Sequence, residues 1–203
     1  MRILMRAIDV IAAKRDLLAP QCLTCTWWQH DGHGAVTPTL RTDWEQEVES
    51  EAGFFGRALF DGDAVLGWMQ VAPAALVPRA QRLPAGPPSD DAYLLTCCYF
   101  YDEEYLNGFQ LLLQEIEASL KHRRVVALEA FAACSSPPED RFRGYLREIN
   151  LFNREVLEGN GFRPVRQAGH VARYRLDLTT LIAVPRRSKI REELERRPAA
   201  QPI

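Results

Sequence analysis

Apolar and polar positions alternate in a way that predicts a β-hairpin in the first half of the chain. Two runs rich in residues that favour strands, 56–60 and 64–71, flank the sequence Asp61-Gly62-Asp63. Glycine tolerates the positive φ that a tight turn between antiparallel strands requires. We therefore expect the two runs to form neighbouring antiparallel strands.

The second half of the chain predicts a strand, a helix and another strand. Residues 92–101 form an almost unbroken apolar and aromatic run, which is typical of a strand buried on both faces. Residues 125–131 are apolar again. The segment between them has apolar residues at helical spacing, namely Leu112, Leu113, Ile116 and Leu120. Two strands joined by a helix form a parallel pair with a right-handed crossover.

Weaker patterns predict the elements around this unit. A strand is expected at 2–7, and a helix with one apolar face is expected from Thr42 until Gly53 ends it. Five prolines between positions 73 and 91 favour an irregular surface connection. A further amphipathic helix is expected over 142–158, because its apolar residues recur at helical spacing.

The C-terminal part of the chain adds a closing pair of strands at 162–165 and 171–178. No internal repeat and no linker divides the sequence, so we expect a single domain over residues 1–180. Residues 181–203 form a tail in which arginine and glutamate alternate. This pattern is typical of a solvated helix.

Composition is that of an ordinary globular protein. Of the 203 residues, 47% are hydrophobic and 26% are charged, and the formal net charge is −2. This balance does not favour a nucleic-acid or membrane partner. No apolar run reaches the length of a membrane span, and the charged N-terminus does not fit a secretory signal. Five cysteines cannot all pair within one chain, so we expect a reducing compartment, the cytoplasm.

The predicted order of elements resembles the GNAT superfamily of N-acetyltransferases between residues 56 and 178. Several motifs carry the resemblance: the hairpin turn at 61–63, the strand Thr96-Cys97-Cys98-Tyr99-Phe100, the turn at Gly108, and Asn150, Glu158, Gly161 and Phe162 of a family pattern. Val77-Pro78-Arg79-Ala80 and the strand Leu128-Glu129-Ala130-Phe131 additionally resemble an actinobacterial-type, hence bacterial, group of uncharacterised members. The resemblance implies an α/β (α+β) fold with a central mixed twisted sheet of about six to seven strands and about four flanking helices.

The resemblance also implies that acetyl-CoA is the cosubstrate. Its pantetheine arm would contact the main chain of Cys98, Tyr99 and Phe100, and the side chain of Asn150 would contact the cofactor. The pyrophosphate would lie at the turn whose residues are Tyr105, Leu106, Asn107, Gly108, Phe109 and Gln110. Only Gly108 matches the family pattern in that turn, and the acidic residues 102–104 precede it. The phosphate-binding motif is therefore degenerate.

Two residues bear on catalysis. Glu129 is the candidate general base, because an ionisable residue within an apolar strand either faces a cleft or is paired. An exposed position or a salt bridge with an arginine is the alternative for Glu129. Leu157 stands where many GNAT enzymes have a tyrosine that protonates the departing thiolate. Tyr145 lies about three turns earlier on the expected helix, so we do not expect it to substitute from the same position.

A loop with cysteine, tryptophan and histidine residues is the remaining candidate site. Two thiols and two imidazoles could bind zinc, but the pairs Cys22/Cys25 and His30/His33 are too close in sequence for an ordinary finger. We therefore expect no metal and a packed loop. Trp27 and Trp28 either anchor this loop or form a wall of the acceptor pocket.

Together these features predict an acyltransferase of the N-acetyltransferase type, which transfers an acetyl group from acetyl-CoA to a small-molecule or peptide amine. The alternative is a non-catalytic GNAT-fold protein that binds a ligand or a partner. The altered positions Tyr105, Gln110 and Leu157 motivate that alternative. The tail helix would be a solvated face or a dimer contact, so a homodimer is among the expected assemblies.

Overall fold

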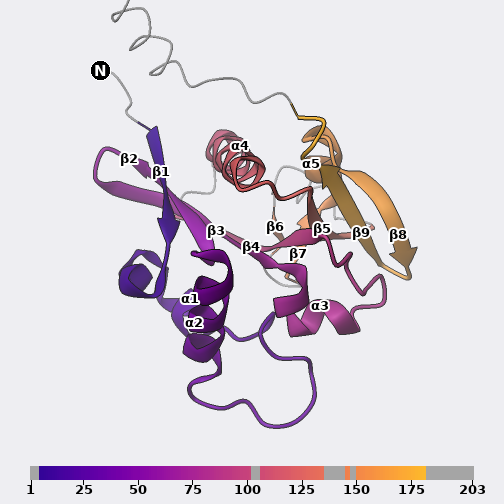
Figure 1. Ribbon diagram of the computed structural model, residues 1–203, viewed down its shortest axis with the longest axis horizontal. Helices are drawn as coiled ribbons and strands as arrows, with labels where there is room; N and C mark the ends of the chain where they lie inside the picture. The colour runs from indigo at the N-terminus through magenta and orange to yellow at the C-terminus, as the bar shows by residue number, and fades with distance from the viewer. Residues whose placement is uncertain (1–4, 102–105, 135–144, 147–149, 182–203) are drawn as a thin grey trace, which may run out of the picture.

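The computed structural model describes residues 5–101, 106–134, 145–146 and 150–181. The described residues form one mixed sheet of nine strands with helices on both faces (Figure 1). The strands are β1 Met5–Val10, β2 Gly56–Asp61, β3 Ala64–Pro73, β4 Ala92–Phe100, β5 Ala127–Ala133, β6 Tyr145–Leu146, β7 Leu151–Asn153, β8 Arg163–Ala168 and β9 Val171–Asp177. The helices are α1 Pro20–Thr24, α2 Leu40–Ala52, α3 Pro78–Arg82, α4 Leu106–His122 and α5 Arg154–Gly159, with short 3-10 helices at Ala12–Leu17 and Ala74–Leu76.

Strands β1 to β4 form an antiparallel meander, which confirms the predicted hairpin. β2 and β3 pair from Asp61↔Ala64, beside the turn, to Gly56↔Gln70 at the other end, and Gly62 in the turn has a φ of 58°. The N-terminal strand lies a few residues later than expected. The proline-rich segment after β3 contains a 3-10 turn and the short helix α3, which begins at Pro78 because proline is tolerated in the first turn of a helix.

Two hydrophobic clusters lie on opposite faces of the sheet. α4 covers one face with its apolar residues, including Phe109, Leu112 and Ile116, and α5 adds Leu157 there. α2 and α3 lie on the other face, where Trp44 and Ala80 join Trp28 and Trp68. Figure 1 shows this division, with α4 and α5 on one side of the strands and α1 to α3 on the other.

β4 and β5 are parallel, as expected, but they pair over only part of their length. The register runs from Ala92↔Ala127 to Leu95↔Ala130. β9 follows the opposite edge of β5 along its whole length, antiparallel. Beyond Ala130, β7 takes the edge that β4 has left, because Ala132 pairs with Phe152. The two central strands therefore diverge, and the β6–β7 hairpin lies in the opening between them.

The helix predicted over 142–158 is wrong in its first part. Of the described residues in this range, only those from Arg154 onward are helical, in α5, and β6 and β7 precede them. Asn150 turns the chain between these strands with a φ of 55°. Asn153 then caps α5, since its side chain accepts a hydrogen bond from the Glu155 backbone N–H at 2.9 Å. The extra hairpin raises the strand count above the six or seven that we expected.

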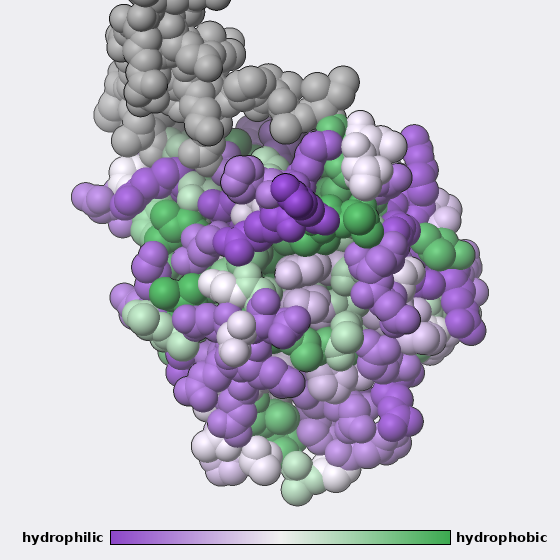
Figure 2. Space-filling model, in the orientation of Figure 1, coloured by the Kyte–Doolittle hydropathy of each residue, from purple (hydrophilic) through white to green (hydrophobic). Residues whose placement is uncertain are grey.

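On the face shown in Figure 2, hydrophobic residues are dispersed among hydrophilic ones. No helix of the described residues is both long and apolar enough to cross a membrane. The predicted tail helix lies outside the described residues, so the division of the chain near residue 180 stays a prediction.

Candidate functional site

A cavity of about 210 Å³ lies where β4 and the β6–β7 hairpin face each other. β4 contributes Cys97, Cys98 and Tyr99, and the hairpin contributes Tyr145 and Asn150. The rest of the wall comes from β3, from α1 with the loop after it, and from α2, through Trp68, Gln21, Cys22, Cys25, Trp28, Gln29 and Arg41. The divergence of the central strands thus creates a small cavity, which we call the wedge cavity.

One wall of the wedge cavity is aromatic and carries a protonated phenol. Trp28 is 2% exposed and packs on Phe131, with 6.1 Å between the ring centroids. Its indole N–H points to the Tyr145 hydroxyl at 3.5 Å, and that hydroxyl donates to Asn150 Oδ1 at 3.4 Å. Burial raises the pKa of Tyr145 well above its ordinary value. Tyr145 therefore holds its proton at neutral pH.

The β4 wall offers a thiol that is not reactive. Burial raises the pKa of the Cys97 thiol to about 12, so almost none of it is thiolate at neutral pH. Cys97 and Cys98 both line the cavity although neighbouring residues of a strand point to opposite faces. Both can do so because the cavity lies at the edge of β4. Among the described lining residues there is no carboxylate and no imidazole.

A buried polar cluster lies beside the wedge cavity, on the side of α2. The carboxylate of Glu45, which is 0% exposed, contacts Arg41 at 2.6 Å and Arg15 at 2.5 Å. Arg41 Nη1 also donates to Gln70 Oε1 at 2.7 Å, and Gln70 in turn donates to Thr96 Oγ1 at 2.7 Å. The spacing of Arg41 and Glu45 by four residues on α2 places them on one helix face. These contacts fix the Arg41 guanidinium against the cavity.

Glu129 lies outside the wedge cavity and is engaged by arginines. Its carboxylate contacts Arg173 at 2.6 Å and Arg175 at 3.3 Å, and it accepts two hydrogen bonds from Ser89. Burial alone would raise the pKa of Glu129, but the hydrogen bonds from Ser89 and Arg173 outweigh it and lower the pKa. A carboxylate held in this way is a weak base. The geometry gives no support to Glu129 as the catalytic base and fits the alternative, a salt bridge.

The predicted cofactor residues fall into two groups. Cys98, Tyr99 and Asn150 line the wedge cavity, whereas Phe100 is buried in the cluster beneath α4. Asn150 is part of a turn between strands and not of a helix. Its side chain holds the hydroxyl of Tyr145.

The predicted pyrophosphate turn forms the start of α4. Asn107 and Gln110 are exposed there, and Phe109 is fully buried against Phe152. Packing explains the glycine at position 108, because a Cβ atom there would lie 3.0 Å from the Phe100 ring. Tyr105 lies outside the described residues, as does the side chain of Leu106. None of the residues 107–110 lines the wedge cavity.

The tryptophan pair has two different roles. Trp28 forms a wall of the cavity, and Trp27 packs edge-on against it at 4.6 Å between ring centroids. The Arg79 guanidinium lies over the Trp27 ring, 4.9 Å from its centroid. Trp27 therefore anchors the loop, while Trp28 is placed to contact a ligand.

The cysteine and histidine residues of this loop do not form a metal site in the structure. Cys22 and Cys25 line the wedge cavity, and His30 accepts a hydrogen bond from the Gly32 backbone N–H. Within the described residues, no three side chains of histidine, cysteine, aspartate or glutamate come together to hold a metal ion. All five cysteines are described, and none is in a disulfide bond.

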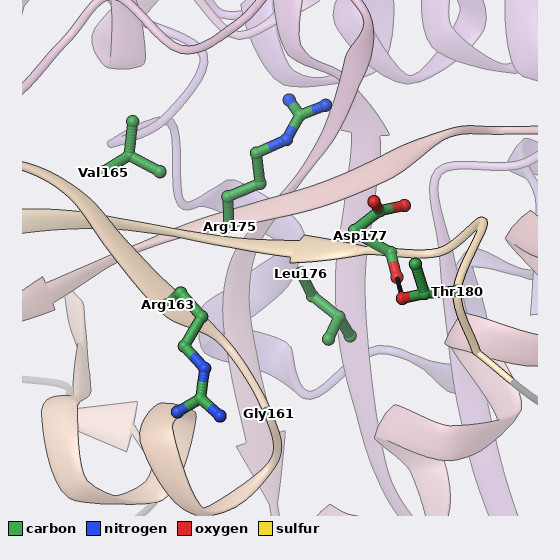
Figure 3. Close-up of a pocket in the computed structure, with 7 residues that line it drawn as sticks. All are labelled: Gly161, Arg163, Val165, Arg175, Leu176, Asp177 and Thr180. Atoms are coloured by element: carbon green, nitrogen blue, oxygen red, sulfur yellow. Dashed lines mark hydrogen bonds between the residues drawn. The ribbon is translucent and has the colours of Figure 1, made fainter.

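A second hollow of about 380 Å³ lies over β8 and β9. Figure 3 shows Arg175 on one side of β9 and Leu176 on the other, so the lining does not converge on one point. Arg175 is already paired with Asp91, and the Thr180 hydroxyl donates to the Asp177 carbonyl at 3.1 Å. These groups are engaged within the protein. The wedge cavity is therefore the better candidate site.

The sequence predicts only part of this site. It favours a helix at Tyr145, whereas the structure has strand β6 there, and no motif marks Arg41 or Trp68. The only local signal was the pair Arg41 and Glu45 at helical spacing beside Trp44. The approach of Trp68, which lies on β3, depends on the tertiary structure.

Comparisons with known proteins agree with the fold. No protein-family model matches the sequence, and no curated protein matches it. Among solved structures, the chain is similar to a candidate acetyltransferase from Acinetobacter baylyi ADP1, with 13% identity, a TM-score of 0.55, and coverage of 89% of this chain and 97% of that one. It is also similar to an N-acetyltransferase from Staphylococcus aureus Mu50, with 12% identity, a TM-score of 0.50, and coverage of 86% and 98%. The chain therefore has the GNAT N-acetyltransferase fold.

Proposed function

We propose that the protein is an N-acyltransferase that transfers an acetyl group from acetyl-CoA to an amine. The observation that carries this proposal is the divergence of β4 and β5 beyond Leu95 and Ala130, with a cavity at that point. In open α/β sheets, ligands bind where neighbouring strands part at their carboxyl ends. The GNAT fold supports acyl transfer by analogy, since a fold alone does not determine function.

The proposed reaction is direct attack of the amine on the thioester carbonyl. A new C–N bond forms and the C–S bond breaks. The leaving thiolate takes a proton from a donor in the protein, and the nitrogen, which becomes cationic on attack, releases one proton to solvent, from which the donor regains its own. Tyr145 is the proposed donor, because its phenol is protonated and lines the cavity. It would take the role that the family resemblance implies for position 157, where Leu157 is a buried residue of α5. The Cys98 and Tyr99 segment of β4 would position the thioester end of the cofactor.

The amine needs no side-chain base in this proposal. The described lining has no carboxylate or imidazole to accept its proton, so the amine would react as its neutral fraction. Below the pKa of the amine, the rate should then rise about tenfold for each pH unit. A plateau that begins several pH units below the pKa of the amine would show that a protein base is at work.

A second candidate function is a ligand-binding protein without acyl transfer. The observation in its favour is the β6–β7 hairpin, which occupies the edge of β5 beyond Ala130. A cofactor arm that lay between the diverging strands would have to share that space with the hairpin. Under this alternative the wedge cavity binds a small molecule, and the cytoplasm and a homodimer remain predictions for either function.

Titration of the protein with acetyl-CoA by calorimetry tests the proposal, followed by a transfer assay with a panel of amines. We expect saturable binding and release of free CoA that depends on the amine. Absence of binding at millimolar acetyl-CoA would overturn the proposal. Binding without transfer to any amine of the panel would favour the second candidate.

Two surface variants connect the activity to the cavity. Cys25 is exposed and lines the wedge cavity, so Cys25→Trp should obstruct it without disturbing the core. Val36 is also exposed but does not line it, and Val36→Trp is the matched control. Transfer should fall at least tenfold in the first variant and stay unchanged in the second. Equal activity of both would place the reaction elsewhere on the protein.

A further inference from the structure

We infer that the wedge cavity binds a small amine that also carries a carboxylate, and that Arg41 and Trp68 hold the carboxylate. The inference rests on the proposed function only where it names this ligand as the acceptor. The binding itself does not depend on acyl transfer. The ligand class is that of a free amino acid or a compound with the same two groups.

The first observation is a pair of buried donors without partners. Arg41 is 5% exposed and Trp68 is 1% exposed, and both line the cavity. Arg41 Nη2 and Trp68 Nε1 have no hydrogen-bond partner among the described residues. Buried polar groups are almost always paired in folded proteins. Two residues that line one cavity therefore each carry an unpaired buried donor, which a ligand with acceptor atoms would satisfy.

The second observation is the charge of the cluster. Arg15 and Arg41 converge on the single carboxylate of Glu45, which leaves one positive charge in excess. The described lining of the cavity adds no acidic group. Arg15 is 30% exposed, so solvent compensates part of the excess, but Arg41 is only 5% exposed. A ligand anion beside Arg41 would lower the remaining cost of its buried charge.

The third observation concerns the shape of the anion. The Arg41 guanidinium stacks near the Trp68 ring, 5.9 Å from its centroid, so the two donors lie on neighbouring groups. Two N–H donors suit the two oxygens of a carboxylate. The Glu45 and Gln70 contacts hold the guanidinium in place before a ligand arrives. Such preorganisation favours tight and selective binding.

The remaining walls set the size and character of the ligand. Trp28, Tyr145 and Trp68 make most of the lining apolar, and a volume of about 210 Å³ admits only a small molecule. The β4 segment Cys97 to Tyr99 is a neighbouring wall, because Trp68 pairs with Tyr99 across β3 and β4. An amine held through its carboxylate at Arg41 and Trp68 would therefore lie beside the strand that positions the thioester.

Calorimetry without acetyl-CoA tests the inference with matched probes. The probes are glycine, L-alanine, L-leucine, L-phenylalanine and L-glutamine, each compared with its own amide. We expect at least one amino acid to bind, and to bind about tenfold or more tightly than its amide, because the amide lacks the charge. If no amino acid binds more tightly than its amide, the inference is overturned. Tighter binding of 2-aminoethyl phosphate than of every amino acid would also overturn it.

Variants locate the carboxylate. Arg41→Gln should bring the affinity ratio of amino acid to amide close to one, and Trp68→Phe should lower the affinity for the amino acid about tenfold while the aromatic wall stays. Arg79→Gln is the control, because Arg79 stacks on Trp27 outside the cavity. If Arg41→Gln does not fold, Trp68→Phe still decides the question, since an unchanged affinity in this variant would contradict the inference.

The outcomes separate this inference from the proposed function. A preference for the carboxylate together with no acetyl transfer would leave the inference standing and remove the enzyme. Suppose instead that acetyl transfer has the same kcat/KM for amines with and without a carboxylate, and that Arg41→Gln changes neither value. That result would support the proposed function and overturn this inference.

Discussion

Two buried carboxylates of this protein, Glu129 and Glu45, have nearly the same surroundings and different consequences. Each is 0% exposed, and each is contacted by two arginines. At Glu129, the second arginine, Arg175, also pairs with Asp91 at 2.8 Å. Two carboxylates, Glu129 and Asp91, thus balance the charges of two guanidinium groups, Arg173 and Arg175, and the cluster has no net charge.

The cluster at Glu45 carries one positive charge in excess. Arg15 and Arg41 share its single carboxylate, and Arg41 keeps one nitrogen without a partner in the described part of the chain. Glu129 therefore acts as an internal tie between β5 and β9, whereas Arg41 is available to a ligand. The comparison teaches that a buried ionisable residue is a better functional candidate when its cluster has an unmatched group than when it is merely buried.

The largest effect is expected from Glu129→Gln. This change leaves Arg173, which is 8% exposed, without its main ionic partner, and breaking a buried pair costs about 3 to 5 kcal/mol of the free energy of unfolding. Urea unfolding measures the loss. The activity of the folded variant should be unchanged, because Glu129 does not line the cavity.

The pH dependence of this loss follows from the lowered pKa of Glu129. A carboxyl whose pKa is lower in the folded state contributes stability above its unfolded pKa, about 4.3, and loses it as the pH falls through the folded value. The difference between wild type and Glu129→Gln should therefore shrink below about pH 4. Asp91→Asn is the matched control, since Asp91 is 55% exposed and its pair should contribute only about 0 to 1 kcal/mol.

Tyr145→Phe should have the next largest effect, on the chemical step. Loss of a proton donor typically slows a reaction about 100-fold, equivalent to about 2.7 kcal/mol. The hydroxyl makes only long contacts, at 3.4 and 3.5 Å, so the fold should be little affected. Single-turnover kinetics with saturating acetyl-CoA provide the measurement. An unchanged rate of acyl transfer would remove Tyr145 from the mechanism.

Arg41→Gln should cost less stability than Glu129→Gln, about 1 to 2 kcal/mol. Glu45 keeps the contact with Arg15 at 2.5 Å, and the variant removes an excess charge whose burial is itself unfavourable. Unfolding of the two variants under the same conditions gives the comparison. If Arg41→Gln were the more destabilising of the two, the Glu45 cluster would be a structural tie like that of Glu129.

The smallest effect is expected from Glu117→Gln on α4, and here the substitution should raise the free energy of unfolding instead of lowering it. Burial raises the pKa of Glu117 to about 7, so the folded state loses stability as the pH rises from about 4.5 through 7. The variant lacks this loss and should be more stable than wild type by about 1 kcal/mol above pH 7, after allowance for partial exposure. Thermal unfolding at pH 5 and pH 8 measures it. A benefit that is equal at both pH values would contradict this explanation.

The sheet could be predicted from the sequence where its strands are long. β2, β3, β4 and β5 are between six and ten residues long and mostly apolar, and Gly62 marks the turn of the hairpin. The β6–β7 hairpin could not be predicted in this way. Its strands are two and three residues long, so they show no alternation. The apolar positions Leu146 and Phe152 fit a helical spacing equally well.

The candidate site was predictable only in part for a related reason. Trp28, Cys98 and Tyr99 lie in segments whose composition or family resemblance drew attention to them. The unmatched donors of Arg41 and Trp68 become visible only when α2 packs on the sheet, because whether a buried group has a partner is a property of the packed structure. Glu129 shows the converse, since its isolated charge in the sequence acquires partners from β9.

The most direct test of the central claim is an NMR titration of the tryptophan side chains. The chain has four tryptophans, and the indole N–H signal of Trp68 can be assigned with Trp68→Phe. Trp44 serves as an internal reference, because its indole N–H already donates to the Leu76 carbonyl at 2.5 Å. Addition of the amino acid that binds most tightly should shift the Trp68 signal downfield in a saturable manner and leave that of Trp44 in place, with a weaker response to the matching amide. A Trp68 signal that does not move at saturation would contradict the claim that the wedge cavity is an open site for a carboxylate.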